Sequence, residues 1–369
     1  MKIDFGSFGA CRIAVVVALL PLVATSAHAQ SGQVALKDGT CAVGADADYI
    51  CGPINAEELI HLDGTPWVLT SQLGAPFLTE GTIYAVDSKT RQWTEVTVDG
   101  DVANLDSETF PNCPGALTAK GFSGHGMTLG HTADGKDRLF AVNHGGREAV
   151  EVFDVVRDGD NLPGLTWIGC IPSPEEGYLN TLATLPDGGL VASKFFGAGN
   201  PGWFGDMMQG KVTGGVHVWH AGHGWSEVPH SQMSGANGVI AVDEGAAIIV
   251  AEWGGKKLHR LSLDGSTAPV SVAVNGRPDN IHRAGEKLLV VAQTVADLGP
   301  FGACMGSMAE VCGGTFDVLS IDSETLETTL VMSVEADPKN FGFGTSALDL
   351  GDEIWVGTTR GNKIAVFSK

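Results

Sequence analysis

The stretch HGM at residues 125–127, followed by LFAVNH at residues 139–144, decides the fold of this chain. A polar residue stands directly before a short apolar strand, and a second apolar strand follows after a turn. Three further stretches repeat this arrangement: NTL at 180–182 before GLVA at 189–192, NGV at 237–239 before AIIV at 247–250, and DNI at 279–281 before LLVV at 288–291. Four such groups in register indicate equivalent points of one repeated unit, directed at a common axis.

The repeat predicts an all-β, six-bladed β-propeller. Short β-type runs alternate with turn residues, and helical periodicity is almost absent. Units of about 40–55 residues with roughly four strands each are typical of propeller blades, and counting from Glu57 to the C-terminus gives six units. The last unit is short, so we expect an N-terminal strand to complete it and to close the ring. A β-sandwich with a similar number of strands is the alternative, but it would not explain the repeat.

The N-terminal residues have the composition of a secretory signal peptide. A basic start precedes an apolar run at 13–23, and AHA at 27–29 fits the small-x-small pattern of a cleavage site. The apolar run is short for a membrane span, so we expect a secreted or periplasmic protein. The expected division is a signal peptide at 1–29, an N-terminal segment with the closing strand at 30–56, and the propeller at 57–369.

The charge balance is strongly acidic, with 43 Asp and Glu against 22 Lys and Arg and a formal net charge of −21. Such a field repels nucleic acid and anionic membrane surfaces and attracts cations. We therefore expect no nucleic-acid partner. Most of these charges are accounted for by an ordinary solvated surface.

Six cysteines follow the leader, an even number that fits disulfides in an oxidising compartment. Proximity along the chain favours the pairs Cys41–Cys51, Cys304–Cys312 and, from the remainder, Cys113–Cys170. Other connectivities are possible for six cysteines. No C-x-x-C motif is present, which argues against a thiolate metal site.

Two Gly-rich insertions interrupt the repeat, at 194–214 and at 294–315. Long insertions between blade strands project from a face of the ring and often carry function. The first is rich in aromatic residues, and we interpret it as a lid or apolar wall over the central site. Packing between blades is the alternative.

Polar residues at the starts of the repeated strands predict a cation site. Asn180, Asn237, Asp279 and Asn280 would converge on the channel, and Glu57 could add a carboxylate from the first blade. Two carboxylates and three amide oxygens suit Ca²⁺, which takes oxygen ligands. Each Asn alone is more often a turn residue, but the joint pattern favours a site.

Two histidines predict a general base beside this site. His125 opens one strand and His144 ends the next, so antiparallel pairing can place them side by side. A histidine held by a second histidine can act as a base near neutral pH; for either residue alone, a structural role is the simpler explanation. A second group, at His217, His220, His223 and His230, has irregular spacing, and we expect no metal site there.

The order and spacing of these motifs resemble the paraoxonase/arylesterase family, within the wider group of gluconolactonase, regucalcin and strictosidine-synthase-like propellers. The resemblance runs from about Glu57 to the C-terminus. It is carried by HGM at 125–127, LFAVNH at 139–144, VEVF at 150–153, LN at 179–180, ANG at 236–238, DNI at 279–281 and IWVGT at 354–358.

The resemblance implies hydrolysis of lactones and aryl esters, with a small-molecule substrate. It implies a histidine dyad of His125 and His144, in which His125 deprotonates water and His144 orients it. It also implies a catalytic Ca²⁺ that polarises the ester carbonyl, with the ligands Glu57, Asn180, Asn237, Asp279 and Asn280. The alternatives are a non-catalytic, calcium-stabilised binding module, and a strictosidine-synthase-like or sugar-lactone enzyme on the same scaffold.

The chain departs from the family pattern at three points. The family's second, structural Ca²⁺ uses an acid where this chain has Thr181, so only Glu58 remains for that second calcium. An acid of the family's pocket falls near Phe195. The family's disulfide between the two ends of the propeller has no counterpart, because no cysteine follows Cys312.

Overall fold

The computed structural model describes residues 1, 34–41, 47–74, 80–132, 134–296, 298–305, 307, 311–335 and 341–369. Apart from Met1, the expected signal peptide lies outside these residues. The described residues from Leu36 to Lys369 form one compact unit. The fold described below is that of Leu36–Lys369.

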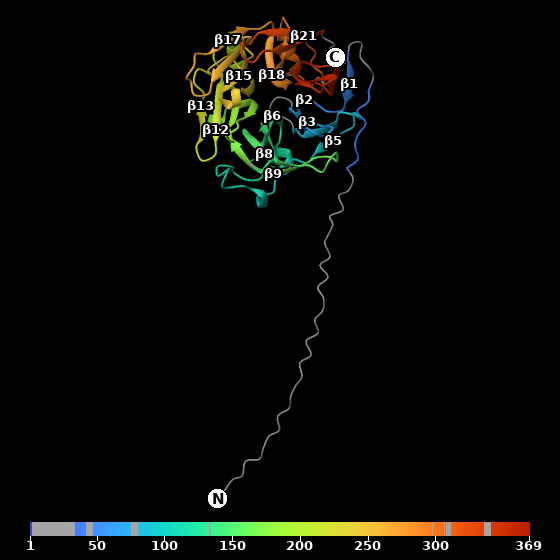
Figure 1. Ribbon diagram of the computed structural model, residues 1–369, viewed down its shortest axis with the longest axis vertical. Coiled ribbons are helices and arrows are strands. Elements are labelled where there is room, and N and C mark those ends of the chain that lie inside the picture. Colours follow the sequence, from blue (N-terminus) through green and yellow to red (C-terminus); the bar gives the residue numbers. More distant parts are fainter. Residues whose placement is uncertain are drawn as a thin grey trace. The chain divides into compact units, whose positions relative to one another are not determined.

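Six antiparallel four-stranded sheets follow one another around a ring (Figure 1), so the prediction of an all-β, six-bladed propeller is confirmed. The first three sheets consist of β2 (Ala56–His61), β3 (Trp67–Gln72), β4 (Ile83–Asp87) and β5 (Trp93–Val96); β6 (Gly124–His131), β7 (Asp137–Asn143), β8 (Ala149–Val156) and β9 (Gly164–Pro172); and β10 (Tyr178–Thr184), β11 (Leu190–Phe196), β12 (Gly215–His220) and β13 (Gly224–Glu227).

The other three sheets consist of β14 (Ala236–Val242), β15 (Ala247–Glu252), β16 (Lys257–Ser262) and β17 (Val270–Ala273); β18 (Arg277–Ala284), β19 (Lys287–Gln293), β20 (Phe316–Ile321) and β21 (Thr328–Val334); and β22 (Gly344–Asp349), β23 (Glu353–Thr358), β24 (Lys363–Ser368) and β1 (Asp48–Cys51). The N-terminal strand β1 pairs with the C-terminal strand β24. Blade six is therefore completed from the N-terminal side, as the sequence predicts.

The six innermost strands form a continuous ring around the central channel. The innermost strands β2, β6, β10, β14, β18 and β22 each contact the innermost strands of both neighbouring blades. Apolar side chains fill the space between adjacent blades. Six separate hydrophobic clusters occupy the six interfaces between blades. Burial of apolar surface at every interface stabilises the ring and fixes which ends of the inner strands meet at the channel.

Among the described residues, helical structure is confined to short segments. The helices are α1 (Trp203–Met208) and α2 (Leu298–Met305), one in each predicted insertion, and the 3₁₀ turns are η1 (Val102–Asn104), η2 (Ala119–Gly121), η3 (Pro174–Glu176) and η4 (Asp243–Gly245). Within the described residues, none of the helices is long and apolar enough to cross a membrane.

Three disulfides are present: Cys41–Cys51, Cys113–Cys170 and Cys304–Cys312. These are the pairs that proximity along the sequence favours. Three disulfides fit an oxidising extracellular or periplasmic location.

Candidate functional site

All six innermost strands contain the same β-bulge near their first residue. In each, two residues oppose a single residue of the neighbouring strand, so the pairing shifts by one. A bulge re-aims side chains and is common beside active sites. The bulged pairs are Glu57-Glu58, His125-Gly126, Asn180-Thr181, Asn237-Gly238, Asp279-Asn280 and Thr345-Ser346.

The first residue of every bulge lines one cavity of about 330 Å³ at the centre of the ring. These six residues are Glu57, His125, Asn180, Asn237, Asp279 and Thr345. Among the second residues, Glu58 and Thr181 line a separate cavity of about 350 Å³. The bulges thus divide the polar residues of the channel between two cavities.

Glycine is required at the second bulge position of two blades because neighbouring backbones approach closely there. A Cβ on Gly126 would lie 2.2 Å from the carbonyl oxygen of Asn180, and one on Gly238 would lie 2.3 Å from that of Asp279. Any larger residue would push adjacent bulges apart and widen the ring at the site.

Side-chain hydrogen bonds connect the expected calcium ligands across the ring. Asn280 Nδ2 donates to Glu57 Oε1 at 2.9 Å. The Thr181 hydroxyl lies 2.6 Å from Asn280 Oδ1 and 2.8 Å from Asn180 Oδ1, and its one proton goes to one of them. The structure therefore brings together residues that are far apart in the sequence.

Asp279 is held by two side-chain amides. Gln293, at the end of β19, donates from Nε2 to Asp279 Oδ2 and to the Gly344 carbonyl oxygen at 2.9 Å. Asn237 also hydrogen-bonds to Asp279, and its own Oδ1 has no partner. Sequence reasoning missed Gln293, which reads as an ordinary strand end.

The donor set fits a hard cation. Glu57 and Asn237 are 1% and 3% exposed, and their oxygens Oε2 and Oδ1 have no hydrogen-bond partner. A buried acceptor without a partner costs roughly 1–3 kcal/mol, which a bound cation would remove. The group has only two carboxylates, and within the described residues no set of three or more His, Cys, Asp or Glu forms a metal cluster. Its remaining ligands would be amide oxygens, which calcium also binds.

Burial and like charge perturb both carboxylates. Burial, followed by the charges of Glu58 and Asp279, raises the pKa of Glu57 well above its usual value. Burial raises the pKa of Asp279 to about 8, and the charge of Glu58 adds to this effect. Without a cation the two acids are neutralised by protons instead.

His125 and His144 form the expected pair. His125 Nδ1 lies 2.9 Å from His144 Nε2. His125 Nε2 lies on the side of the expected calcium ligands, 3.7 Å from Glu57 Oε1. Burial, followed by the neighbouring His144, lowers the pKa of His125 well below its usual value. Burial lowers the pKa of His144 to about 3. Both imidazoles are therefore neutral at pH 7, as a general base requires.

Two residues that sequence reasoning missed contact His144. Its Nδ1 lies 2.8 Å from Glu148 Oε2. Burial raises the pKa of this carboxyl to about 8. The Tyr178 ring stacks flat on the His144 ring, with centroids 3.6 Å apart and an interplanar angle of 6°. The only signal in the sequence is that Glu148 follows His144 by four residues.

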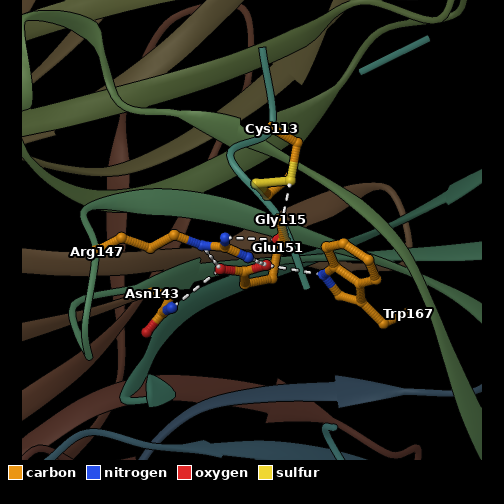
Figure 2. Close-up of a disulfide and its surroundings, with 7 residues drawn as sticks. Cys113, Gly115, Asn143, Arg147, Glu151 and Trp167 are labelled. Carbon is orange, nitrogen blue, oxygen red and sulfur yellow. Dashed lines mark hydrogen bonds and ion pairs between the residues drawn. A yellow bond between two sulfur atoms is a disulfide. The ribbon is translucent and has the colours of Figure 1, made fainter. Parts of the chain in front are cut away.

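The loop that carries His144 and Glu148 is anchored at both ends to a buried carboxylate (Figure 2). Glu151 is 0% exposed and accepts two bonds of 2.7 Å from Arg147, one of 3.0 Å from Asn143 and one of 2.9 Å from Trp167. Arg147 also donates to the Gly115 carbonyl oxygen at 2.8 Å, beside the Cys113–Cys170 disulfide. The positions of Asn143 and Arg147 are thereby fixed on either side of His144.

An aromatic wall covers one side of the cavity. Phe195, Phe196, Trp203 and Phe204, from the first insertion, line it. The Phe196 ring stacks on Tyr178 at 4.7 Å and on Trp203 at 4.4 Å between centroids. The interpretation of this insertion as an apolar wall fits these contacts. The same segment also packs on other blades, because its Met207 lies in one hydrophobic cluster with Trp253 and Phe343.

The remaining candidates lie elsewhere. Glu58 Oε1 is 2.7 Å from His282 Nε2, so an imidazole occupies one side of the residue considered for a second calcium. His220 pairs with Asp187 at 3.0 Å on the surface.

Comparison with known proteins supports the fold alone. No protein-family model and no curated protein matches the sequence significantly. The luciferin-regenerating enzyme has a TM-score of 0.53 at 16% identity, over 86% of this chain and 92% of that chain. A candidate gluconolactonase (TM-score 0.48, 16% identity, 90% and 94% covered) and virginiamycin B lyase from Staphylococcus aureus (0.46, 13%, 87% and 98%) overlap less well. Together, fold and site define a six-bladed propeller whose central cavity is lined by polar residues of the bulges and by an aromatic wall.

Proposed function

We propose that this protein is an exported, calcium-dependent hydrolase of lactones or aryl esters. One observation carries the proposal. The imidazole of His125 and the partnerless acceptor oxygens of Glu57 and Asn237 belong to residues that line the same cavity. The resemblance of the motif order to paraoxonases and arylesterases supports the same reaction.

Glu57, Asn180, Asn237, Asp279 and Asn280 would hold the calcium. A bound Ca²⁺ would polarise the ester carbonyl and stabilise the negative charge that develops on its oxygen. The chain supplies these ligands from four blades, so the closed ring sets their arrangement.

His125 acts as the general base. Its Nε2 takes a proton from water while the water oxygen attacks the carbonyl carbon. His144 Nε2 lies 2.9 Å from His125 Nδ1, and this contact keeps the His125 ring in place. The aromatic wall binds the apolar part of the substrate and excludes bulk water, which strengthens electrostatic interactions at the site.

The rival hypothesis is a non-catalytic propeller in which calcium only holds the blades together. The hydrogen bonds from Thr345 and Ser346 to the Glu57 carbonyl oxygen, both 2.8 Å, show that blades are linked here without an ion. A structural ion needs no adjacent base, so the His125–His144 pair favours catalysis.

The test is a hydrolysis screen of lactones and aryl esters, in calcium and in chelator, with His125→Gln and the control His220→Gln. His220 pairs with a carboxylate far from the cavity. We expect calcium-dependent turnover that falls by about 10²-fold or more in His125→Gln alone, with calcium affinity unchanged by calorimetry. Turnover that survives both chelator and His125→Gln would refute the proposal.

A further inference from the structure

Glu148, His144 and His125 form a continuous hydrogen-bonded series that leads to the cavity. Glu148 Oε2 lies 2.8 Å from His144 Nδ1, and His144 Nε2 lies 2.9 Å from His125 Nδ1. His125 Nε2 then remains on the side of Glu57 and Asn180, at 3.7 and 3.4 Å. Both ring nitrogens of His144 are engaged in this series. In the neutral ring one nitrogen donates and the other accepts, so the role of one fixes the role of the other.

The positions of the protons on the two histidine rings follow from the chemistry of the Glu148 carboxyl group. Above its pKa of about 8, Glu148 is ionised and only accepts hydrogen bonds, so it then requires a proton on His144 Nδ1. In a neutral imidazole the other nitrogen is then an acceptor. His144 Nε2 must therefore accept from His125 Nδ1–H, which leaves a lone pair on His125 Nε2, facing the cavity.

The opposite arrangement would disable the base. If His144 carried its proton on Nε2, His125 Nδ1 would have to accept the hydrogen bond from that N–H. The proton of His125 would then lie on Nε2, directed at the expected calcium ligands. That nitrogen could not take a proton from water. The two arrangements differ only in which nitrogen of each ring is protonated.

We propose that Glu148 is a positioning residue that sets the tautomers of His144 and His125 so that the lone pair of His125 Nε2 faces the cavity. This inference rests on the proposed function. It adds a third member to the dyad, one that touches neither substrate nor ion.

The surroundings hold this series in one orientation. Tyr178 stacks flat on His144 and prevents its ring from turning, and the bonds of Asn143 and Arg147 to Glu151 fix the loop. The side chain of His144 is 5% exposed. A surface pair, Asp187 with His220, has the same chemistry at 3.0 Å but with side chains 64% and 38% exposed, and it provides a matched control.

The test measures the tautomers directly, by ¹⁵N NMR of histidine side chains in the substrate-free protein at pH 9. We compare the unmodified protein with Glu148→Leu, Glu148→Gln and the control Asp187→Asn. We expect both dyad rings to carry the proton on Nδ1, and Glu148→Leu to shift His125 toward the Nε2–H form. Glu148→Gln should lie between, because an amide can either accept or donate. Asp187→Asn should leave the dyad unchanged.

Kinetics provide the second readout. We expect kcat for an aryl ester to fall by about 10²-fold in Glu148→Leu, with KM and calcium affinity unchanged. A His125 proton on Nε2 in the unmodified protein, or an unchanged tautomer in a folded Glu148→Leu or Glu148→Gln variant, would overturn the inference. If the tautomer shifts but no lactone or ester is hydrolysed, the positioning role stands and the proposed function fails.

Discussion

The calcium-free protein should lose stability as pH rises, because Asp279 is buried among other acceptors. Its pKa is raised to about 8 by burial, whereas an unfolded Asp titrates near 3.9. Between these values the folded state binds one more proton than the unfolded state. The contribution of Asp279 to the free energy of unfolding therefore falls by about 1.4 kcal/mol for each pH unit, or about 2.7 kcal/mol from pH 5 to pH 7, and this loss ends above pH 8. Glu57 and Glu148, whose pKa values are also raised, add to the loss in the same direction.

The matched variant is Asp279→Asn, which has no such proton to lose. His125 and His144 have lowered pKa values and act in the opposite direction below about pH 6.5, so the informative quantity is the difference between the two proteins. Urea unfolding in calcium-free buffer at pH 5, 6 and 7 measures it. In saturating calcium the difference in slope between the two proteins should disappear, because the cation replaces the proton on Asp279.

A parallel pH dependence of the two calcium-free proteins would refute this reasoning. It would mean that Asp279 is ionised in the folded state already at pH 5. A difference between the two proteins that persists in saturating calcium would argue against a cation at Asp279.

Three further outcomes are expected. Asn237→Ala should lower calcium affinity at least about tenfold by calorimetry, because it removes a buried acceptor without a partner; unchanged affinity would exclude Asn237 as a ligand. Turnover should rise with pH through about 8 as Glu148 ionises beside His144 and Tyr178, and Glu148→Gln should flatten that rise; a profile that keeps its shape would separate Glu148 from the reaction. Glu151→Gln should cost about 3–5 kcal/mol in unfolding free energy, since it breaks a buried ion pair with Arg147. The control Glu95→Gln removes an exposed pair with Lys37 and should cost under about 1 kcal/mol; equal losses would contradict the anchoring role.

The sequence predicts the fold well because the repeat lies in local patterns. A polar residue before an apolar strand identified His125, Asn180, Asn237 and Asp279. The equivalent pair in blade six, Thr345-Ser346, escaped notice because Thr and Ser are common in ordinary strands. A bulge adds one residue and changes which side chains face the channel, and no single stretch shows it.

The site residues that were missed depend on contacts between strands. Gln293 reaches Asp279 from the adjacent strand, and Glu148 reaches His144 across a loop. Neither residue type is unusual at its position. Their roles follow from side-chain directions that only the folded ring determines, so local propensity carries no sign of them.

Closure of the ring by β1 and β24 has a consequence for the order of folding. Glu57 and Asn280 are 223 positions apart, and the Thr345 hydroxyl meets the Glu57 carbonyl oxygen across 288 positions. Such contacts form late, because long stretches of chain must first be brought together. Strand β1 can pair only after β24 is in place. We therefore expect the calcium-ligand residues to come together, and binding competence to appear, in a single cooperative step at the end of folding.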